Sequence, residues 1–244
     1  MVLHITTRIH TYAPEQIKIH TFLLTAKIYQ KHKKESAMPH DTKTGPVIES
    51  IMDKYHATFE QSLADHGKVM QVRLDLRYPE NGYATPDSKH IHDFSYNLKR
   101  SIARQKFAGN HDPDPKLLWV REQNESEHPH YHALVLVNGN SLNNPHSIFE
   151  KAGRLWGRAL GVDPTGLVHH CDKDRHGNRQ ENGIMIRRGS PDEAAQRAKC
   201  EQQASYLAKA YSKDTRPKGA WTCGGTRTPK GGAKLTLPRQ VYQG

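Results

Sequence analysis

Two histidines one residue apart, His130 and His132, begin an apolar and β-branched segment that runs to Val137. Such a segment is typical of a buried strand. Side chains on a strand alternate between its two faces, so both imidazoles point to one side and Tyr131 points to the other. Imidazole is the commonest metal ligand in proteins. Two imidazoles held side by side on a strand therefore predict a prearranged metal site with a third ligand from elsewhere in the chain.

Glu122 is the residue that we expect to complete this metal site. It ends a second predicted strand, 117–122, and a polar turn separates that strand from the histidine strand, so the two should form a hairpin. The hairpin places the Glu122 carboxylate beside His130 and His132 on the polar side of the sheet. Two imidazoles and one carboxylate, with positions open for water and a phosphate oxygen, suit Mn²⁺ or Mg²⁺. Zinc would also bind such a set, so the ligand types leave the metal open.

The histidine pair has a simpler explanation, and one further histidine competes as a ligand. The chain contains 17 histidines, and a bare His-x-His pair arises often by chance on a surface. The strand context and the carboxylate on the neighbouring strand favour the metal site over that explanation. His128 faces the same way as His130 but precedes a proline, so we place it in the turn and outside the ligand set.

Tyr206 is the nucleophile that we predict, in a helix over residues 191–212. Successive helical residues lie about 100° apart, which puts Tyr206 on a polar and basic face. That face also carries Lys199, Gln202, Gln203, Lys209 and Lys213. A second face is small and apolar, as packing against a sheet requires, and consists of Cys200, Ala204, Leu207 and Tyr211. Tyr211 is thus predicted to be a core residue.

The chemistry of a phenol sets what Tyr206 needs from its neighbours. A free phenol has a pKa near 10 and is mostly protonated at neutral pH. Lys209, one helical turn away, and a divalent ion would favour the phenolate. Tyr-x-x-Lys alone is a weak signal, and the alternative is an ordinary tyrosine of an amphipathic helix. The histidine strand upstream is what favours the catalytic interpretation.

The remaining periodic segments must position these residues. We predict helices at 47–63, closed by Gly67, at 88–107 and at 145–160. Strands are predicted at 69–77, with a polar outer face, and at 167–171 and 184–187 as a second hairpin. This order predicts an α+β fold, an antiparallel sheet with helices packed on one face.

Composition limits the class of partner. The chain has 244 residues, a net charge of +11 and a pI of about 9.5, which favours nucleic acid first and an anionic membrane surface second. The sequence contains no run of about 18 apolar residues, so we predict no transmembrane helix. Three widely spaced cysteines fit a reducing cytoplasm. We expect three parts: an extension at 1–45, helical or loosely ordered, a domain at 46–212, and a basic Gly/Pro-rich tail at 213–244.

The residues of three motifs resemble those of a known protein family. In order they are Trp119-Val120-Arg121-Glu122-Gln123-Asn124, Pro129-His130-Tyr131-His132 and Ser205-Tyr206-Leu207-Ala208-Lys209. They resemble the HUH endonucleases, which are rolling-circle replication initiators and relaxases. The closest resemblance is to the inovirus-type replication proteins (YagK/YfjJ-like) of phages and prophages. It covers about residues 46–212 and does not explain the extension.

The resemblance implies a fold and a reaction. The fold would be a Rep-type palm, related to ferredoxin-like and RRM-like sheets. Glu122, His130 and His132 would hold Mg²⁺ or Mn²⁺, and Tyr206 would nick single-stranded DNA at a replication origin through a 5′-phosphotyrosine. Lys209 would neutralise charge or position Tyr206, and Asp75 would be an outer-shell partner of a ligating histidine. The partners implied are single-stranded DNA at an origin or hairpin and a host helicase and polymerase, in the cytoplasm of a bacterial host and with no membrane.

Basic residues outside this site are predicted to contact DNA phosphates. They are Arg100, Arg104, Lys199 and Lys213, together with the tail. For each single Lys or Arg, a solvated surface charge is the simpler explanation.

Three alternatives remain open at this point. The first is a non-enzymatic origin-binding or regulatory DNA-binding protein. The second is a zinc-stabilised module, although its candidate ligands fit no closed Cys/His framework. Those ligands are His169, His170, Cys171, Cys200 and Cys223. The third keeps the chemistry in a small mobilisation relaxase or a transposase; we expect no full conjugative relaxase, since no helicase domain is present.

Overall fold

A computed structural model describes residues 47–80, 86–105, 110–123, 128–173, 176–209 and 221–227. These residues all fall within one compact unit that spans residues 44–244. The predicted extension at 1–45 and most of the predicted tail at 213–244 lie outside the described residues.

The elements predicted between residues 46 and 212 are present and follow the predicted order. Among the described residues they are α2 (Glu49–His66), β1 (Lys68–Leu76), α3 (Ser88–Ala103), β2 (Lys116–Glu122), β3 (His130–Asn138), α4 (His146–Leu160), β4 (Val168–His169), β5 (Ile184–Arg187), α5 (Glu193–Leu207) and β6 (Cys223–Gly225). The last of these was not predicted. Of the helices in these ranges, none is long and apolar enough to cross a membrane.

Local sequence explains where the helices begin and end. The buried apolar residues of α2 recur every four positions, which is the spacing of one helical face. Gly67 closes α2 in the left-handed conformation, with φ of 66°, and its N–H donates to the carbonyl of Leu63. At the start of α3, the Asp87 carboxylate accepts a hydrogen bond from the Lys89 N–H and satisfies one of the free donors of the first turn.

The sheet has the strand order β4-β1-β3-β2-β6, and its described pairs are antiparallel. The predicted hairpin of β2 and β3 is confirmed, with Glu122 directly opposite His130. On the other side of β3, Asp75 of β1 is directly opposite His132. Three adjacent strands thus bring the polar residues to one end of the sheet.

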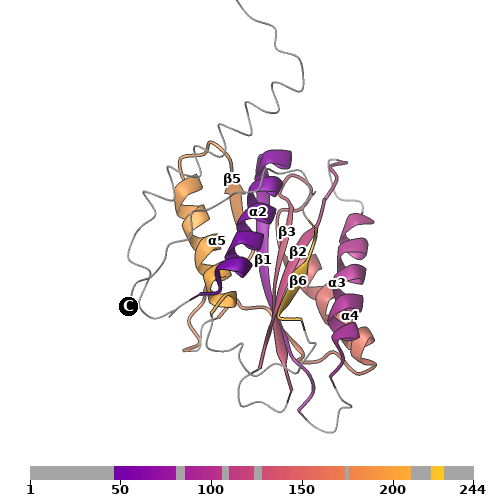
Figure 1. Cartoon of the computed structure of the whole chain (residues 1–244). Coiled ribbons are helices and arrows are strands. Elements are labelled where there is room, and N and C mark those ends of the chain that lie inside the picture. The colour runs from indigo at the N-terminus through magenta and orange to yellow at the C-terminus, as the bar shows by residue number, and fades with distance from the viewer. Residues whose placement is uncertain are drawn as a thin grey trace, which may run out of the picture. The chain divides into compact units, whose positions relative to one another are not determined.

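The α+β fold is confirmed, but the prediction that the helices pack on one face was wrong. Helices α3 and α4 cover one face of the sheet, and α2 and α5 cover the other (Figure 1). The error came from the polar face of β1, which we took to be an outer face. Gln71 on that face is fully buried, because its side chain accepts a hydrogen bond from Tyr55 of α2 and donates to the Cys200 carbonyl of α5.

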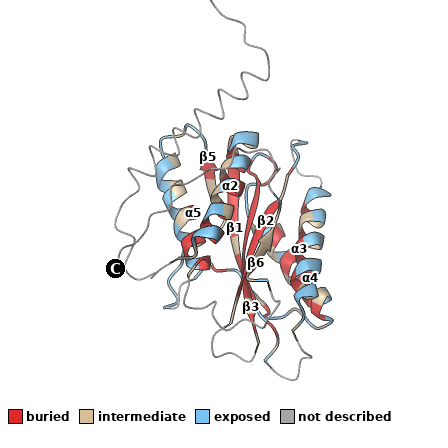
Figure 2. Ribbon diagram, viewed as in Figure 1, coloured by how far each residue is buried: buried red, intermediate tan, exposed pale blue. Residues whose placement is uncertain are grey.

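The face under α3 and α4 is almost entirely apolar. Buried residues line the sides of these helices that face the sheet and the strands that they cover (Figure 2). Trp156 of α4 packs edge to face against Phe94, and its Nε1 donates to the Arg77 carbonyl. Tyr131, the middle residue of the His-x-His pair, packs on this side against Trp119, as its place on the strand predicts.

Two strand pairings differ from the prediction. β4 and β5 do not form a hairpin; both pair with β1, β4 near its end and β5 near its start. Within the tail, β6 extends the sheet beyond β2. A Cβ atom at position 224 would collide with the Trp119 ring, so the glycine there allows the β6 backbone to lie against that side chain.

Candidate metal centre

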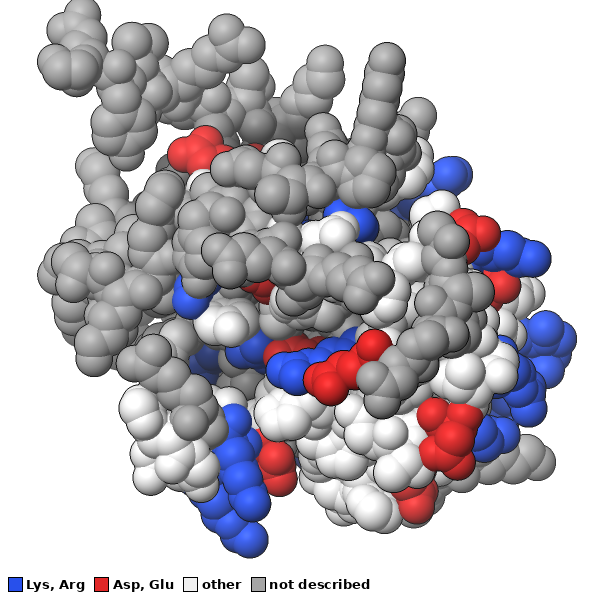
Figure 3. Space-filling view, turned by 90° about the horizontal axis from the view of Figure 1, so that it is seen from below, with Lys and Arg blue, Asp and Glu red and all other residues white. Residues whose placement is uncertain are grey.

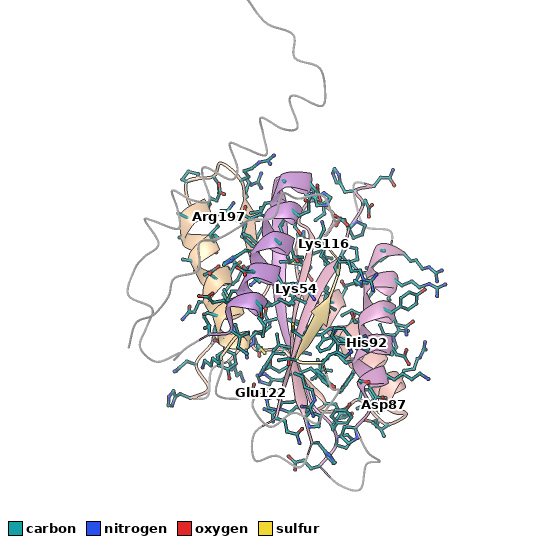
Figure 4. The ribbon with its side chains drawn as sticks, viewed as in Figure 1. Lys54, Asp87, His92, Lys116, Glu122 and Arg197 are labelled. Atoms are coloured by element: carbon teal, nitrogen blue, oxygen red, sulfur yellow. The ribbon has the colours of Figure 1, made fainter. Side chains whose placement is uncertain are left out.

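The three predicted ligands come together at the lower end of the sheet, where Figure 4 labels Glu122. One ligand atom from each of Glu122, His130 and His132 lies within 4.8 Å of the others. Glu122 Oε2 is 3.2 Å from His130 Nε2 and also contacts His132 Nε2. Both imidazole Nε2 atoms therefore face one carboxylate oxygen, which is the arrangement that the hairpin predicted.

Burial differs across the three ligands and gives the group an open side. The His132 side chain is 4% exposed and that of Glu122 is 12% exposed, whereas that of His130 is 28% exposed. Two imidazoles and a carboxylate with one side open to solvent can hold a divalent ion and leave coordination positions for water or a phosphate oxygen.

Asp75 fixes the orientation of the buried ligand. Its Oδ1 atom lies 2.6 Å from His132 Nδ1, so Nδ1 donates to this carboxylate and Nε2 is the nitrogen left for a metal. The predicted place of Asp75, behind a ligating histidine, matches this geometry. Arg73 was not predicted, and its guanidinium pairs with the same carboxylate at 3.0 Å.

The carboxylates and the imidazole shift one another's pKa values. Burial would raise the pKa of Asp75, but the hydrogen bond from His132 and the charge of Arg73 outweigh it and hold the pKa well below the ordinary range. Burial would lower the pKa of His132, yet its hydrogen bonds to Asp75 and Glu122 raise it. These hydrogen bonds favour the protonated imidazole, and a divalent ion at Nε2 would compete with that proton.

Tyr206 stands directly beside the ligand group. Its ring centroid is 5.5 Å from that of His132, at an interplanar angle of 84°. Two cations flank the ring: the Arg73 guanidinium carbon and the Lys209 Nζ each lie 4.0 Å from its centroid. A bridge between Lys209 and Val47 and a hydrogen bond from the Ile48 N–H to the Ala208 carbonyl fasten this end of α5 to the start of α2.

The two predicted faces of α5 are found for the residues that the structure describes. Cys200, Ala204 and Leu207 are buried, and Tyr206 is 39% exposed. Tyr211 and Lys213, the remaining members of the two faces, lie outside the described residues.

The acidity of Tyr206 differs from the expectation. Burial raises the pKa of the phenol above its ordinary value; Arg73 lowers it, and Asp75 raises it further. The cation that chiefly offsets the effect of burial on the pKa of Tyr206 is therefore Arg73, whereas we predicted Lys209 for this role. No signal in the sequence marked Arg73, because only the fold brings β1 and the end of α5 together.

The predicted DNA-contacting residues do not share one surface. Arg100 and Arg104 extend from α3, on the face of the sheet opposite the metal centre. Lys199 lies on α5 and pairs with Glu181 at 2.6 Å. Seen from the end of the sheet that holds Glu122, basic and acidic side chains lie next to one another (Figure 3).

The zinc module weighed above does not assemble in the described residues. His169 and Cys171 lie close to Asp75, within 4.8 Å by their ligand atoms, but Cys200 is buried against Gln71 and Cys223 belongs to β6. His128 is outside the ligand group, as predicted, and its ring lies 6.0 Å from that of Tyr78.

Comparison with known proteins places the chain in a family. No curated protein matches it. The family described as the YagK/YfjJ C-terminal domain matches residues 30–220, which is more than half of the chain and includes every described ligand and Tyr206. The chain therefore belongs to the YagK/YfjJ C-terminal domain family.

Proposed function

We propose that this protein is a metal-dependent tyrosine endonuclease and strand transferase of the HUH type. It would nick single-stranded DNA at a replication origin and begin rolling-circle replication. The observation that carries the proposal is the juxtaposition of a Glu-His-His group with a partly exposed tyrosine whose ring is 5.5 Å from the ring of His132.

The donor set fits a divalent ion, Mg²⁺ or Mn²⁺. Glu122 and the Nε2 atoms of His130 and His132 would hold it, while Asp75 fixes the ring of His132 from behind. When bound, such an ion polarises a phosphate oxygen and stabilises charge on the scissile phosphate.

Tyr206 is the nucleophile of the proposed reaction. Its Oη forms a bond to phosphorus while the bond from phosphorus to the 3′ oxygen breaks. The phenol proton passes to water, and the departing oxygen takes a proton from water and becomes a free 3′-hydroxyl. The phosphate remains on Tyr206 as a 5′-phosphotyrosine, so the same site can rejoin the strand by the reverse step.

Lys209 and Arg73 support that step from the two cation positions beside the ring. Both stand 4.0 Å from the ring centroid, where positive charge stabilises the phenolate as its proton leaves. Arg73 also holds Asp75, so one side chain supports both the nucleophile and the buried metal ligand.

Detection of a covalent adduct tests the proposal. The full chain is incubated with Mn²⁺ and single-stranded DNA from the intergenic region of its own genetic element, labelled at the 5′ or the 3′ end, and the products are separated on denaturing gels. We expect an adduct that carries the 3′ label, because Tyr206 is joined to the new 5′ end, while the 5′-labelled fragment is released with a free 3′-hydroxyl. The adduct should require metal and disappear in Tyr206→Phe and in the double variant His130→Ala, His132→Ala.

The other outcomes identify the alternatives. An adduct that survives Tyr206→Phe and disappears in Tyr211→Phe would make Tyr211 the nucleophile instead of Tyr206. DNA binding without an adduct under any divalent ion would favour the non-enzymatic DNA-binding protein. Nicking at a transfer origin or a transposon end, instead of a replication origin, would favour a small mobilisation relaxase or a transposase.

A further inference from the structure

A shallow hollow of about 520 Å³ lies on the surface of α3, away from the metal centre. It is lined by Tyr96, Lys99, Arg100, Ala103, Arg104 and Pro115. Helix α3 covers the face of the sheet that lies opposite α5 and Tyr206, so this hollow is a surface separate from the candidate active site. We call it the α3 hollow.

The cations of the α3 hollow lack acidic partners among the described residues. None of Lys99, Arg100 and Arg104 has an ion pair with a described carboxylate, unlike the four cations Arg73, Lys116, Arg197 and Lys199. The acidic residue next to the hollow in sequence is Asp114, and it is already bonded to Lys116 and His66. Burial lowers the pKa of Lys99, and no carboxylate in the described part of the chain offsets that effect. An anion in the hollow would supply the missing negative charge.

The hollow also presents an exposed aromatic ring. Tyr96 is 61% exposed, and the guanidinium carbon of Arg100 lies 6.0 Å from the centroid of its ring. An exposed ring with cations around it is the arrangement on which unpaired bases stack while phosphates contact the cations. In a duplex the base faces are covered by their neighbours, so the ring favours a single strand.

We propose that the α3 hollow binds single-stranded DNA, with one base stacked on Tyr96 and phosphates on Arg100, Arg104 and Lys99. The strand in the hollow would be a segment away from the scissile phosphate. The inference takes the kind of polymer from the proposed function but does not depend on nicking.

Binding of a fluorescent oligonucleotide to the full chain, measured by anisotropy without divalent ions over a series of salt concentrations, tests the inference. The test variant is Arg100→Gln with Arg104→Gln; both residues are exposed, so we expect the variant to fold as the unchanged protein does. The matched control is Arg154→Gln with Arg158→Gln, two exposed arginines at the same spacing on α4. We expect the test variant to bind about tenfold more weakly. The salt slope, which is the slope of the logarithm of the binding constant against the logarithm of the salt concentration, should become less steep by about 0.7 for each lost phosphate contact. The control should change neither quantity appreciably.

Tyr96→Ala separates stacking from charge. It should weaken binding about tenfold without changing the salt slope, because stacking releases no counterions. Equal losses in the test and control variants, or a loss only for a duplex of the same length, would overturn the inference. If the test variant loses binding but no Tyr206 adduct ever forms, the α3 hollow binds DNA and the nuclease proposal is rejected. If the adduct forms but the test variant binds as well as the unchanged protein, the nuclease proposal stands and the α3 hollow is rejected.

Discussion

The two faces of the sheet share strands but differ in the side chains that they bury. Towards α3 and α4, β1 presents Met70, Val72, Leu74 and Leu76, and the face is almost wholly apolar. Towards α2 and α5, the same strand presents Gln71, Arg73 and Asp75. Gln71 donates to the Cys200 carbonyl, Asp75 accepts from His132, and the Arg73 guanidinium lies over the Tyr206 ring. The difference teaches that one face is packed almost wholly by apolar side chains, whereas the other combines a second apolar cluster with polar groups held in fixed positions. A polar residue on a strand indicates that a partner is needed, not that the face is open to water.

Truncation on the apolar face should have the largest effect on stability. Trp156 is fully buried, and its Nε1 donates to the Arg77 carbonyl. Trp156→Ala should lower the free energy of unfolding by about 3–5 kcal/mol, since it opens a cavity and leaves that carbonyl without its donor. Urea denaturation followed by circular dichroism measures this change. Tyr206→Phe is the control on the other face and should cost less than about 1 kcal/mol; equal losses would refute the division between the faces.

Removal of the charge behind His132 should affect metal binding more than folding. In Asp75→Asn the side chain keeps its shape but loses the negative charge that holds the His132 imidazole in place. The affinity for Mn²⁺ should therefore fall about 10- to 100-fold. Calorimetric titration with Mn²⁺ measures the change.

Asp114→Asn is the matched control for that experiment. Asp114 also accepts from an imidazole, His66, and from a lysine, Lys116, but it lies just before the start of β2 whereas Glu122 lies at its end. The affinity of the Glu-His-His group should not change in this variant. Asp114 also belongs to a group with Asp65 and His66 whose ligand atoms lie within 4.8 Å of one another, so a similar loss in both variants would mean that the titration reports that group or general charge and not His132.

The raised pKa of His132 predicts how stability without metal depends on pH. The folded protein binds this proton more tightly than the unfolded chain does, so the stabilisation is complete below about pH 6.5 and is lost as the pH rises through the folded pKa. With Mn²⁺ the trend should reverse, because the ion competes with the proton for Nε2. Melting temperatures between pH 5 and 9, with and without Mn²⁺, test this. The metal-free slope should disappear in His132→Gln, and its persistence there would assign it to another group.

Much of the candidate site could be predicted from local pattern. The alternation of a strand placed His130 and His132 together, the short turn placed Glu122 opposite them, and helical spacing separated Tyr206 from the buried face of α5. Each of these inferences involves residues on one element or on two elements joined by a turn. The α+β class followed in the same way from the order of the elements.

What could not be predicted depends on pairings between distant segments. Arg73 reaches Tyr206 only because α5 packs on the polar face of β1, and nothing within β1 shows which helix will cover it. The pairing of both β4 and β5 with β1, and the addition of β6 to β2, likewise join segments that are far apart in the chain. Such contacts are set by how whole faces pack and not by the periodicity of any one element.

Substitution of a neutralised surface cation should have the smallest effect. Lys199 is on the polar face of α5, but its ion pair with Glu181 is about half exposed on both sides, so Lys199→Ala should change the free energy of unfolding by less than about 1 kcal/mol. We predicted a phosphate contact for Lys199, and its pairing limits that contact, because DNA must first compete with Glu181. The salt slope of single-stranded DNA binding should therefore fall by less than the value of about 0.7 for a full contact, and by less than in the Arg100 and Arg104 variant. Anisotropy on the unchanged protein, on Lys199→Ala and on the Arg100 and Arg104 variant measures these differences. A larger change for Lys199→Ala would mean that the main DNA surface is on the face of the metal centre and not on α3.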